Sequence, residues 1–420
     1  MVKAKKKVTK VTKVTRTKKK VVKKSVPRKS RSTLKPAESL SEEIKTTYQP
    51  VSIPTLDLEE YEAKITTDVV ADDIHKVSTN YAWIGAGQCG GRLVKSFYDV
   101  GYRKVLAINT THHDLDLLEI PAEYKLLMDI GEMGAGKDMA RGNEAVQQYR
   151  QEILHLMQTK FGGKLNHIMI AVGAGGGTGS GSVHQLVDLA KKYARHVGIS
   201  NPHKHVGVML TLPTVGEASS PIVAQNAHKV VTELGHLAEQ GEISPLIIID
   251  NEKISKMYPG LTVKHFWPSI NGTVAGLFDI FNRLSALSSG YTSFDSVDYH
   301  SIMSVGGCAI MGLTKVKQVE DRYAISEAVK NNLEKTLLAS GFNLSSATLA
   351  GCIVVGGRRL MADIPGLQDN INYAFDVLAD ITGKATIHRG IYEDDKDSLR
   401  VYTIIGGLDA PGKRMQELET

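Results

Sequence analysis

The sequence Gly173-Ala174-Gly175-Gly176-Gly177-Thr178-Gly179-Ser180-Gly181 follows directly on an apolar segment that ends at Val172. Glycines let a backbone approach a phosphate chain and point successive N–H groups at it. A helix that begins near Gly181 adds the positive end of its dipole. The run lacks the Gly-Lys-Ser/Thr ending of a Walker loop, so it predicts a different kind of phosphate-binding turn. A flexible linker explains it poorly, because the run lies between a predicted buried strand and a predicted helix.

Apolar segments of strand length alternate with helical segments on both sides of this turn. The predicted strands lie at 81–84, 105–108, 125–130, 167–172, 205–212 and 246–249. The predicted helices lie at 92–100, 142–161, 181–197 and 222–240. This alternation is typical of an α/β fold with a doubly wound, mostly parallel sheet, in which ligands bind at the carboxyl ends of the strands.

The remaining chain predicts a long central helix and a second, smaller α/β domain. The helix covers 272–289 and is closed by Gly290. The second region has predicted strands near 304–313, 349–355, 386–392 and 399–405, and predicted helices near 321–339 and 368–381. Cys308 and Cys352 fall in its apolar runs and are expected in the core, and Asp394-Asp395 is expected in a hairpin turn.

The formal charge of +6 is a sum of two unlike parts. Residues 1–35 carry 16 Lys and Arg and no acid, whereas the other 385 residues carry 35 basic and 45 acidic side chains, a net of −10. Like charges with Val and Thr predict a disordered basic tail at 1–35, followed by a linker at 36–78. The chain has no apolar stretch of the roughly 18 residues that a membrane span needs. Three cysteines without CxxC spacing favour a reducing, cytoplasmic location.

A second glycine-rich turn, Gly85-Ala86-Gly87-Gln88-Cys89-Gly90, follows the first predicted strand and matches GxGxxG. A dinucleotide-binding dehydrogenase would have an acidic residue about 20 positions further on. Asn109-Thr110 stands there instead, which argues against that class. Two glycine-rich turns in one sheet predict a polyphosphate held from two sides.

These two turns and Asp250-Asn251-Glu252 together resemble the tubulin/FtsZ superfamily of GTP-dependent filament proteins, over about residues 80–408. The overall length and the C-terminal organisation are closer to those of FtsZ, while several motifs have the residues that are usual in tubulin. The resemblance implies a GTP-binding domain at 79–271, the central helix at 272–289 and a C-terminal activation domain at 290–408. A short tail at 409–420 completes the chain.

The resemblance also implies a nucleotide site. Its binding residues would be Gly87, Gln88, Cys89, Gly90, Arg92, Asn109, Gly134, Ala135, Gly136, Gly175, Gly176, Gly177, Thr178, Gly179, Ser180, Glu217, Asn251, Trp267 and Asn271. Among them, 134–136 would sense the γ-phosphate and Glu217 would bind ribose. Asn251 and Asn271 would read guanine, on which Trp267 would pack. Mg²⁺ is expected to be held through phosphates and water, without a protein metal ligand.

The segment 290–298 matches the family's catalytic loop, which reaches the nucleotide of a neighbouring subunit. Asp295 and Asp298 match the acids that polarise the attacking water. A solvated acidic turn is the alternative reading of the same residues.

Three positions depart from the family pattern, and one further residue adds a cation. Ser293 stands where Asn is usual, which puts the rate of hydrolysis in doubt, and Arg92 replaces an Asn or Gln near the base. Pro221 replaces a common Arg, and Lys137 is an extra cation beside the γ-phosphate loop.

The sequence thus predicts a GTPase that forms a head-to-tail homopolymer and hydrolyses GTP at the subunit interface. The expected task is the positioning or segregation of DNA or particles, with 1–35 binding DNA or another polyanion. The alternatives are an FtsZ-type division ring and a non-polymerising GTP-binding protein tethered to nucleic acid by its tail. The segment after 408 shows no tail peptide of the FtsZ kind, which argues against the division role.

Overall fold

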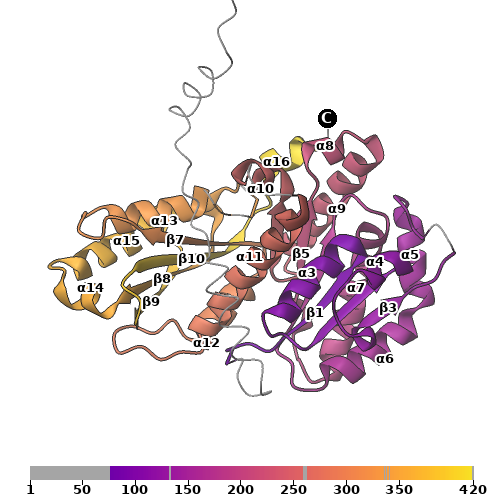
Figure 1. Cartoon of the computed structure of the whole chain (residues 1–420), viewed down its shortest axis with the longest axis horizontal. Coiled ribbons are helices and arrows are strands. Elements are labelled where there is room, and N and C mark those ends of the chain that lie inside the picture. The colour runs from indigo at the N-terminus through magenta and orange to yellow at the C-terminus, as the bar shows by residue number, and fades with distance from the viewer. Residues whose placement is uncertain are drawn as a thin grey trace, which may run out of the picture. The chain divides into compact units, whose positions relative to one another are not determined.

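The computed structural model describes residues 76–418, apart from 132–133, 259–262, 335, 337 and 340. The predicted basic tail at 1–35, and the predicted linker up to residue 75, lie outside the described residues. Ten strands form one sheet in the order β3-β2-β1-β4-β5-β6-β7-β10-β8-β9. Figure 1 shows this sheet with helices packed against it and α11 running between its two halves.

The first six strands are parallel, and all of them except the half-buried edge strand β3 are buried. They are β1 (Tyr81–Ala86), β2 (Val105–Asn109), β3 (Lys125–Leu127), β4 (His167–Gly173), β5 (Val206–Leu212) and β6 (Leu246–Asp250). Continuous runs of Val, Ile, Leu and Ala suit strands that are covered on both faces. In the register of the central pair, Ile84 lies beside Ile170.

The chain winds outward in two directions from the centre of this sheet. It runs from β1 to β2 and β3 on one side, and from β4 to β5 and β6 on the other. The connecting helices are α3 (Gly87–Asp99), α4 (His112–Asp116), α5 (Met139–Gln148), α6 (Arg150–Phe161), α7 (Thr178–His196), α8 (Val215–Ala218), α9 (Pro221–Glu239) and α10 (Asn251–Met257). Because right-handed crossovers in opposite directions separate their helices, a crevice forms between the carboxyl ends of β1 and β4.

The second half continues the same sheet. Its elements are α11 (Val263–Leu284), α12 (Ser296–Met303), β7 (Cys308–Val316), α13 (Ala324–Glu334), β8 (Leu349–Gly357), α14 (Arg358–Asp363), α15 (Leu367–Ile381), β9 (Thr386–Asp394), β10 (Leu399–Leu408) and α16 (Gly412–Gln416). Strand β7 joins β6 through the parallel pair Leu246–Cys308. Strand β10 is antiparallel to both β7 and β8. The predicted α/β class with a mostly parallel sheet is confirmed.

Two expectations need correction. The helix expected at 272–289 is α11, which begins at Val263 and ends at Leu284. It includes Pro268, although an interior proline removes a hydrogen bond and crowds the preceding turn, and it ends where the chain tightens into i→i+3 turns at Ala286 and Leu287. The hairpin expected at Asp394-Asp395 is also wrong, because β10 pairs with β7 and β8 and not with β9.

The core is continuous across both halves of the sheet. Trp83 of β1 is fully buried and stacks on Phe97 of α3, with ring centroids 3.4 Å apart, and Phe278 of α11 meets both rings edge-on. Cys308 and Cys352 are buried as predicted. Helix α11 is thus fastened to the first half by aromatic packing. Among the described residues, every helix is too short or too polar to cross a membrane.

Candidate functional site

A cavity of about 330 Å³ opens at the carboxyl ends of β1, β2, β4, β5 and β6. It includes the crevice at which the winding of the sheet reverses, where α/β folds bind their ligands. Many of the residues predicted to bind nucleotide line it, namely Gly87, Gln88, Cys89, Asn109, Gly136, Gly175, Gly176, Gly177, Thr178, Gly179, Glu217 and Asn251. Segments that lie up to 164 positions apart in the sequence therefore meet at one place.

Two helices present bare N-termini to this cavity. Helix α3 begins after Ala86 and α7 begins after Gly177, and neither has a side-chain cap or an acidic residue in its first turn. By contrast, α5 and α12 are capped by the carboxylates of Asp138 and Asp295. Unpaired N–H groups together with the positive end of the helix dipole attract anions. This wall of the cavity has the character of a phosphate site.

Thr110 connects the glycine run to the loop at 134–138. Its hydroxyl lies 2.7 Å from the hydroxyl of Thr178 and accepts a hydrogen bond from the backbone N–H of Ala135 at 3.1 Å. Lys137 of the same loop is exposed and lines the cavity. Gly134 and Ala135 therefore shape this loop behind the wall, and the extra cation noted in the sequence lies at the cavity itself.

Other predicted binding residues lie outside the lining. Gly90 packs against β4, where a Cβ would come within 2.1 Å of the Ala171 carbonyl oxygen, and the Ser180 hydroxyl donates to the Ala174 carbonyl at 2.6 Å. These two residues hold the turns together. Arg92 lies on α3, and Trp267 and Asn271 lie on α11. Their contact with a nucleotide stays a prediction.

Asp114 is a cavity residue that the sequence motifs did not reveal. Its carboxylate accepts hydrogen bonds from Gln88 Nε2 at 2.8 Å, Asn109 Nδ2 at 3.0 Å and Thr111 Oγ1 at 3.0 Å. Asp114 thereby fixes the amide groups of Gln88 and Asn109 at the cavity. Only its position shortly after β2, at the carboxyl edge of the sheet, could have indicated from the sequence that Asp114 lies at the site.

The opposite wall carries a buried acceptor, Asn251 Oδ1, without a hydrogen-bond partner among the described residues. The Thr211 hydroxyl, which also lies at the cavity, is next to the Cys89 thiol. Unpaired buried acceptors are rare and costly, which indicates that a ligand supplies the partner. Burial raises the pKa of the Cys89 thiol, so it is neutral at this wall at neutral pH.

Asp295 and Asp298 lie at the other edge of the sheet. Helix α12 ends at Met303, whose carbonyl accepts from Ser244 Oγ just before β6, and the His300 ring lies 4.9 Å from the His205 ring just before β5. Both contacts are at the amino ends of parallel strands, whereas the cavity is at their carboxyl ends. At about 3.3 Å per residue, the seven-residue strand β5 separates these edges by about 20 Å. Figure 1 shows α12 and α8 at opposite ends of the sheet.

The two acids cap α12 reciprocally. Asp295 Oδ1 accepts from the backbone N–H groups of Val297 and Asp298, and Asp298 Oδ2 accepts from the N–H of Asp295. The other oxygen of Asp298 lies 2.6 Å from His388 Nδ1 on β9. The acids therefore have a structural task within the subunit, while Asp295 stays exposed to solvent.

Strand β9 also holds the loop before α12. The hydroxyl of Tyr392 accepts from the Phe294 N–H at 2.8 Å and donates to the Phe294 carbonyl at 3.0 Å. The Ile391 N–H donates to the Thr292 carbonyl at 2.8 Å, and Ser293 Oγ accepts from the Ser289 N–H at 3.0 Å. Ser293, which differs from the Asn usual in the family, therefore stabilises a turn inside this loop.

Known proteins share sequence similarity with the part of the chain that forms this cavity. Residues 80–259 match the GTPase domain of the Tubulin/FtsZ family. The cell division protein FtsZ 2 of Halobacterium salinarum is 25% identical over 337 residues, which cover 78% of this chain and 76% of that protein. The tubulin-like protein CetZ of Pyrococcus abyssi is 25% identical over 337 residues, which cover 77% of this chain and 84% of that protein.

Solved structures share the fold. TubZ of Bacillus thuringiensis serovar israelensis, in its GTPγS-form protofilament, superposes with a TM-score of 0.70 at 19% identity, over 83% of this chain and 92% of that chain. CetZ1 of Haloferax volcanii, a GDP-bound monomer, gives a TM-score of 0.63 at 22% identity, over 81% and 97% of the two chains. The fold is therefore tubulin-like. The GTPase domain matched at residues 80–259 and the FtsZ and CetZ relatives support a member of the tubulin/FtsZ superfamily.

Proposed function

We propose that the cavity binds GTP and GDP. The bare N-termini of α3 and α7 and the glycine run would hold the phosphates, and Lys137 would add positive charge beside them. Mg²⁺ would be held through phosphates and water and would neutralise phosphate charge. Glu217 would bind the ribose. The match of residues 80–259 to the Tubulin/FtsZ GTPase domain and the unpaired Asn251 Oδ1 support this assignment.

Asn251 favours guanine over adenine. Its Oδ1 is a buried acceptor without a partner among the described residues. Guanine presents N–H donors at N1 and N2, whereas adenine presents an unprotonated N1 at the same edge. An acceptor placed opposite N1 and N2 is satisfied by guanine but not by adenine, whose amino group lies at N6, so the wrong base leaves it unpaired.

We propose further that GTP is hydrolysed at a composite site between two subunits. The observation that carries this proposal is the position of Asp295 and Asp298 at the amino edge of the sheet, about 20 Å from the cavity of the same subunit. A carboxylate that orients water must lie within hydrogen-bond reach of that water. A second subunit, stacked head to tail, would bring its acids to the first subunit's cavity. Such a contact repeats as an open filament.

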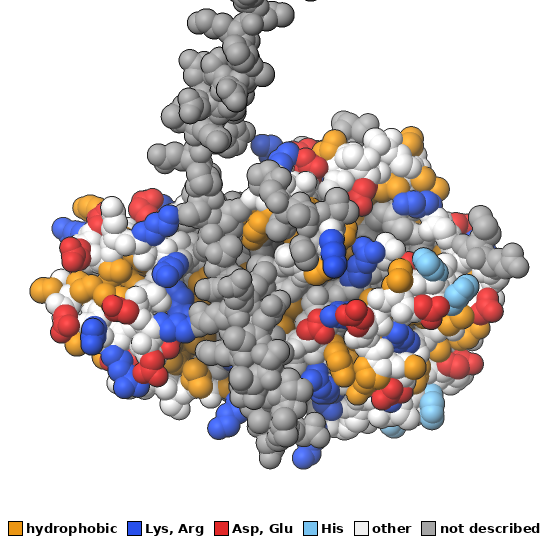
Figure 2. Space-filling view, in the orientation of Figure 1, with side chains coloured by type: hydrophobic (Ala, Val, Ile, Leu, Met, Phe, Trp, Pro, Cys, Tyr) orange, Lys and Arg blue, Asp and Glu red, His pale blue; other side chains and the backbone are white. Residues whose placement is uncertain are grey.

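Exposed apolar side chains support contact at both edges. Near the cavity, Val215 is 61% exposed and Ile222 is 44% exposed. Near the acids, Leu287, Tyr291 and Val297 are between 50% and 68% exposed. Figure 2 shows apolar side chains scattered among acidic and basic ones over the visible face, and Leu117, Tyr323 and Tyr373 are also more than 40% exposed. Apolar side chains at both edges of the sheet suit a contact in which one edge meets the other.

Assembly tests this proposal. Incubation of the full chain with GTP should raise light scattering and bring most of the protein into the pellet on ultracentrifugation, whereas GDP or ATP should leave it in the supernatant. GTP favours assembly because the γ-phosphate completes the surface that meets the next subunit. Absence of a GTP-dependent pellet at any tested concentration or salt would refute the filament.

We propose positioning or segregation of DNA or particles as the task of the filament, with residues 1–35 as the contact to a polyanion. Those residues lie outside the described part of the chain, and their charge alone supports the contact. A division ring is the second candidate, which the name of the FtsZ relative favours.

A further inference from the structure

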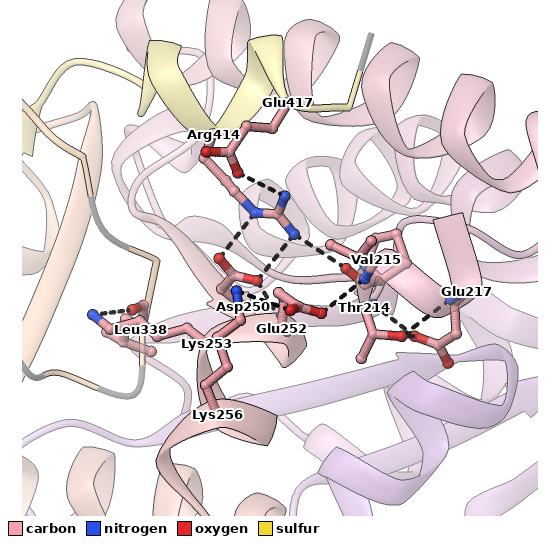
Figure 3. A network of polar contacts seen from close by, with 11 residues as sticks. Thr214, Val215, Glu217, Asp250, Glu252, Lys253, Lys256, Leu338, Arg414 and Glu417 are labelled. Carbon is pink, nitrogen blue, oxygen red and sulfur yellow. Dashed lines mark hydrogen bonds and ion pairs between the residues drawn. The ribbon is translucent and has the colours of Figure 1, made fainter. Parts of the chain in front are cut away.

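Arg414 of α16 is buried in an ion pair with the end of β6 (Figure 3). Its Nε donates to Asp250 Oδ2 at 2.9 Å, and its Nη2 donates to Asp250 Oδ1 at 3.2 Å. The two side chains are 8% and 6% exposed. A bidentate pair that is this deeply buried holds one geometry, because the two parallel hydrogen bonds fix the orientation of both groups.

The same guanidinium reaches a second segment of the cavity wall. Nη2 also donates to the carbonyl of Pro213 at 3.2 Å, and Pro213 lines the cavity directly after β5. At the outer side, Nη1 lies 3.1 Å from Glu417 Oε2. One side chain therefore joins three segments: α16, the end of β6 and the turn after β5.

These segments build the wall that carries the predicted guanine and ribose contacts. Asp250 Oδ1 accepts from the Glu252 N–H at 3.1 Å and so caps α10, whose first residue is Asn251. Glu252 Oε2 in turn accepts from the Val215 N–H at 2.9 Å. That hydrogen bond is the largest of the influences that lower the pKa of Glu252, to which Lys256 and Arg414 also contribute. The network fixes the backbone on either side of Asn251.

The turn after β5 is held by the same network. Thr214 and Glu217 form a capping box: Glu217 Oε2 accepts from the Thr214 N–H at 2.8 Å, and Thr214 Oγ1 accepts from the Glu217 N–H at 3.1 Å. Figure 3 shows this box beside Val215, Glu252 and Asp250, with Arg414 above them. Pro213 directly precedes the box, so its bond to Arg414 fixes where Glu217 lies.

We propose that Arg414 is a positioning residue for the guanine nucleotide, and that α16 is thereby part of the nucleotide site. This inference rests on the proposed function. Arg414 holds Asn251 and Glu217 in place through Asp250 and Pro213, while the phosphate turns after β1 and β4 lie outside its hydrogen bonds. Loss of Arg414 therefore weakens recognition of base and ribose and spares recognition of the phosphates.

The test compares two probes on the full chain. The dissociation constants of GDP and of tripolyphosphate, which lacks base and ribose, are measured for wild type, Arg414→Gln and Lys413→Gln. Lys413 is the exposed neighbour of Arg414 on the same helix and serves as the matched control. Arg414→Gln should raise the GDP constant at least about tenfold and leave the tripolyphosphate constant within about twofold. Lys413→Gln should change neither constant.

A double variant separates positioning from general damage. Arg414→Gln leaves Asp250 as a buried carboxylate without its cation, whereas Asp250→Asn combined with Arg414→Gln restores an uncharged pair. The double variant should recover part of the lost GDP affinity. Unchanged GDP binding in Arg414→Gln, or an equal loss for GDP and tripolyphosphate, would overturn the role of Arg414. Failure of the wild type to bind GDP would overturn the proposed function itself.

Discussion

Replacement of Asp298 by Asn should lower GTP turnover by about 10² to 10³-fold in assembled protein, while the GDP affinity of the subunit stays unchanged. The amide still accepts the hydrogen bond that Asp298 Oδ2 takes from the Asp295 N–H, so α12 keeps its cap. What disappears is the negative charge that would orient water at the neighbouring subunit's cavity, together with the carboxylate contact to His388 Nδ1. Phosphate release per subunit, measured at a GTP concentration that saturates assembly, gives the result.

Asp363→Asn is the matched control, because Asp363 is an exposed acid on α14 that lies outside the cavity and outside the acid loop. It should hydrolyse GTP like wild type. If Asp298→Asn filaments hydrolyse GTP at the wild-type rate, Asp298 has no part in catalysis and acts only as a helix cap. Loss of GDP affinity would instead place Asp298 at the cavity of its own subunit.

Gly176→Ala should weaken binding of GTP and GDP by roughly five- to a hundredfold and leave the thermal unfolding midpoint of the ligand-free protein unchanged. Gly176 lines the cavity, and a Cβ added there meets no protein atom within 4 Å. The methyl group would therefore occupy space that we assign to phosphate. Equilibrium binding and thermal unfolding of the same preparations test both parts.

Alanine substitutions at two other glycines serve as controls for this result. Gly163 also has open space around an added Cβ but lies at the end of α6, away from the cavity, so Gly163→Ala should change neither measurement. Gly90→Ala should unfold at a clearly lower temperature, because its Cβ would lie 2.1 Å from the Ala171 carbonyl oxygen. Wild-type nucleotide affinity in Gly176→Ala would mean that the phosphates lie elsewhere.

Much of the fold was predictable because its signals are local. Buried parallel strands read as short runs of Val, Ile and Leu, and the strand ending at Gly173 is followed at once by the glycine turn and α7. The place of β10 between β7 and β8 was not predictable, since it depends on pairing between distant segments. The start of α11 at Val263 was missed because Pro268 is locally a helix breaker.

The cavity was partly predictable for the same reason. Gly87, Asn109, Gly176, Glu217 and Asn251 each directly follow or lie close to a strand end, and parallel strands bring their carboxyl ends to one edge. Other residues of the site have no local sequence pattern that would indicate their position.

Asp114 and Arg414 show what sequence reasoning lacked. Asp114 acts through side-chain bonds to Gln88 and Asn109, and Arg414 contacts a carboxylate 164 residues away. Each has the sequence context of an ordinary surface residue. Only the folded chain shows which backbone segments they fix, because a long-range hydrogen bond leaves no periodic or spacing pattern.

A mixing experiment tests the composite site most directly. Gly176→Ala subunits keep Asp298 but have an impaired cavity, and Asp298→Asn subunits keep the cavity but lack the acid. If each active site takes its cavity from one subunit and its acid from the next, about a quarter of the junctions in an equal, random mixture are intact. The mixture should then hydrolyse GTP well above the sum of the two variants measured separately. Turnover equal to that sum, in mixtures that assemble, would contradict a site shared between subunits.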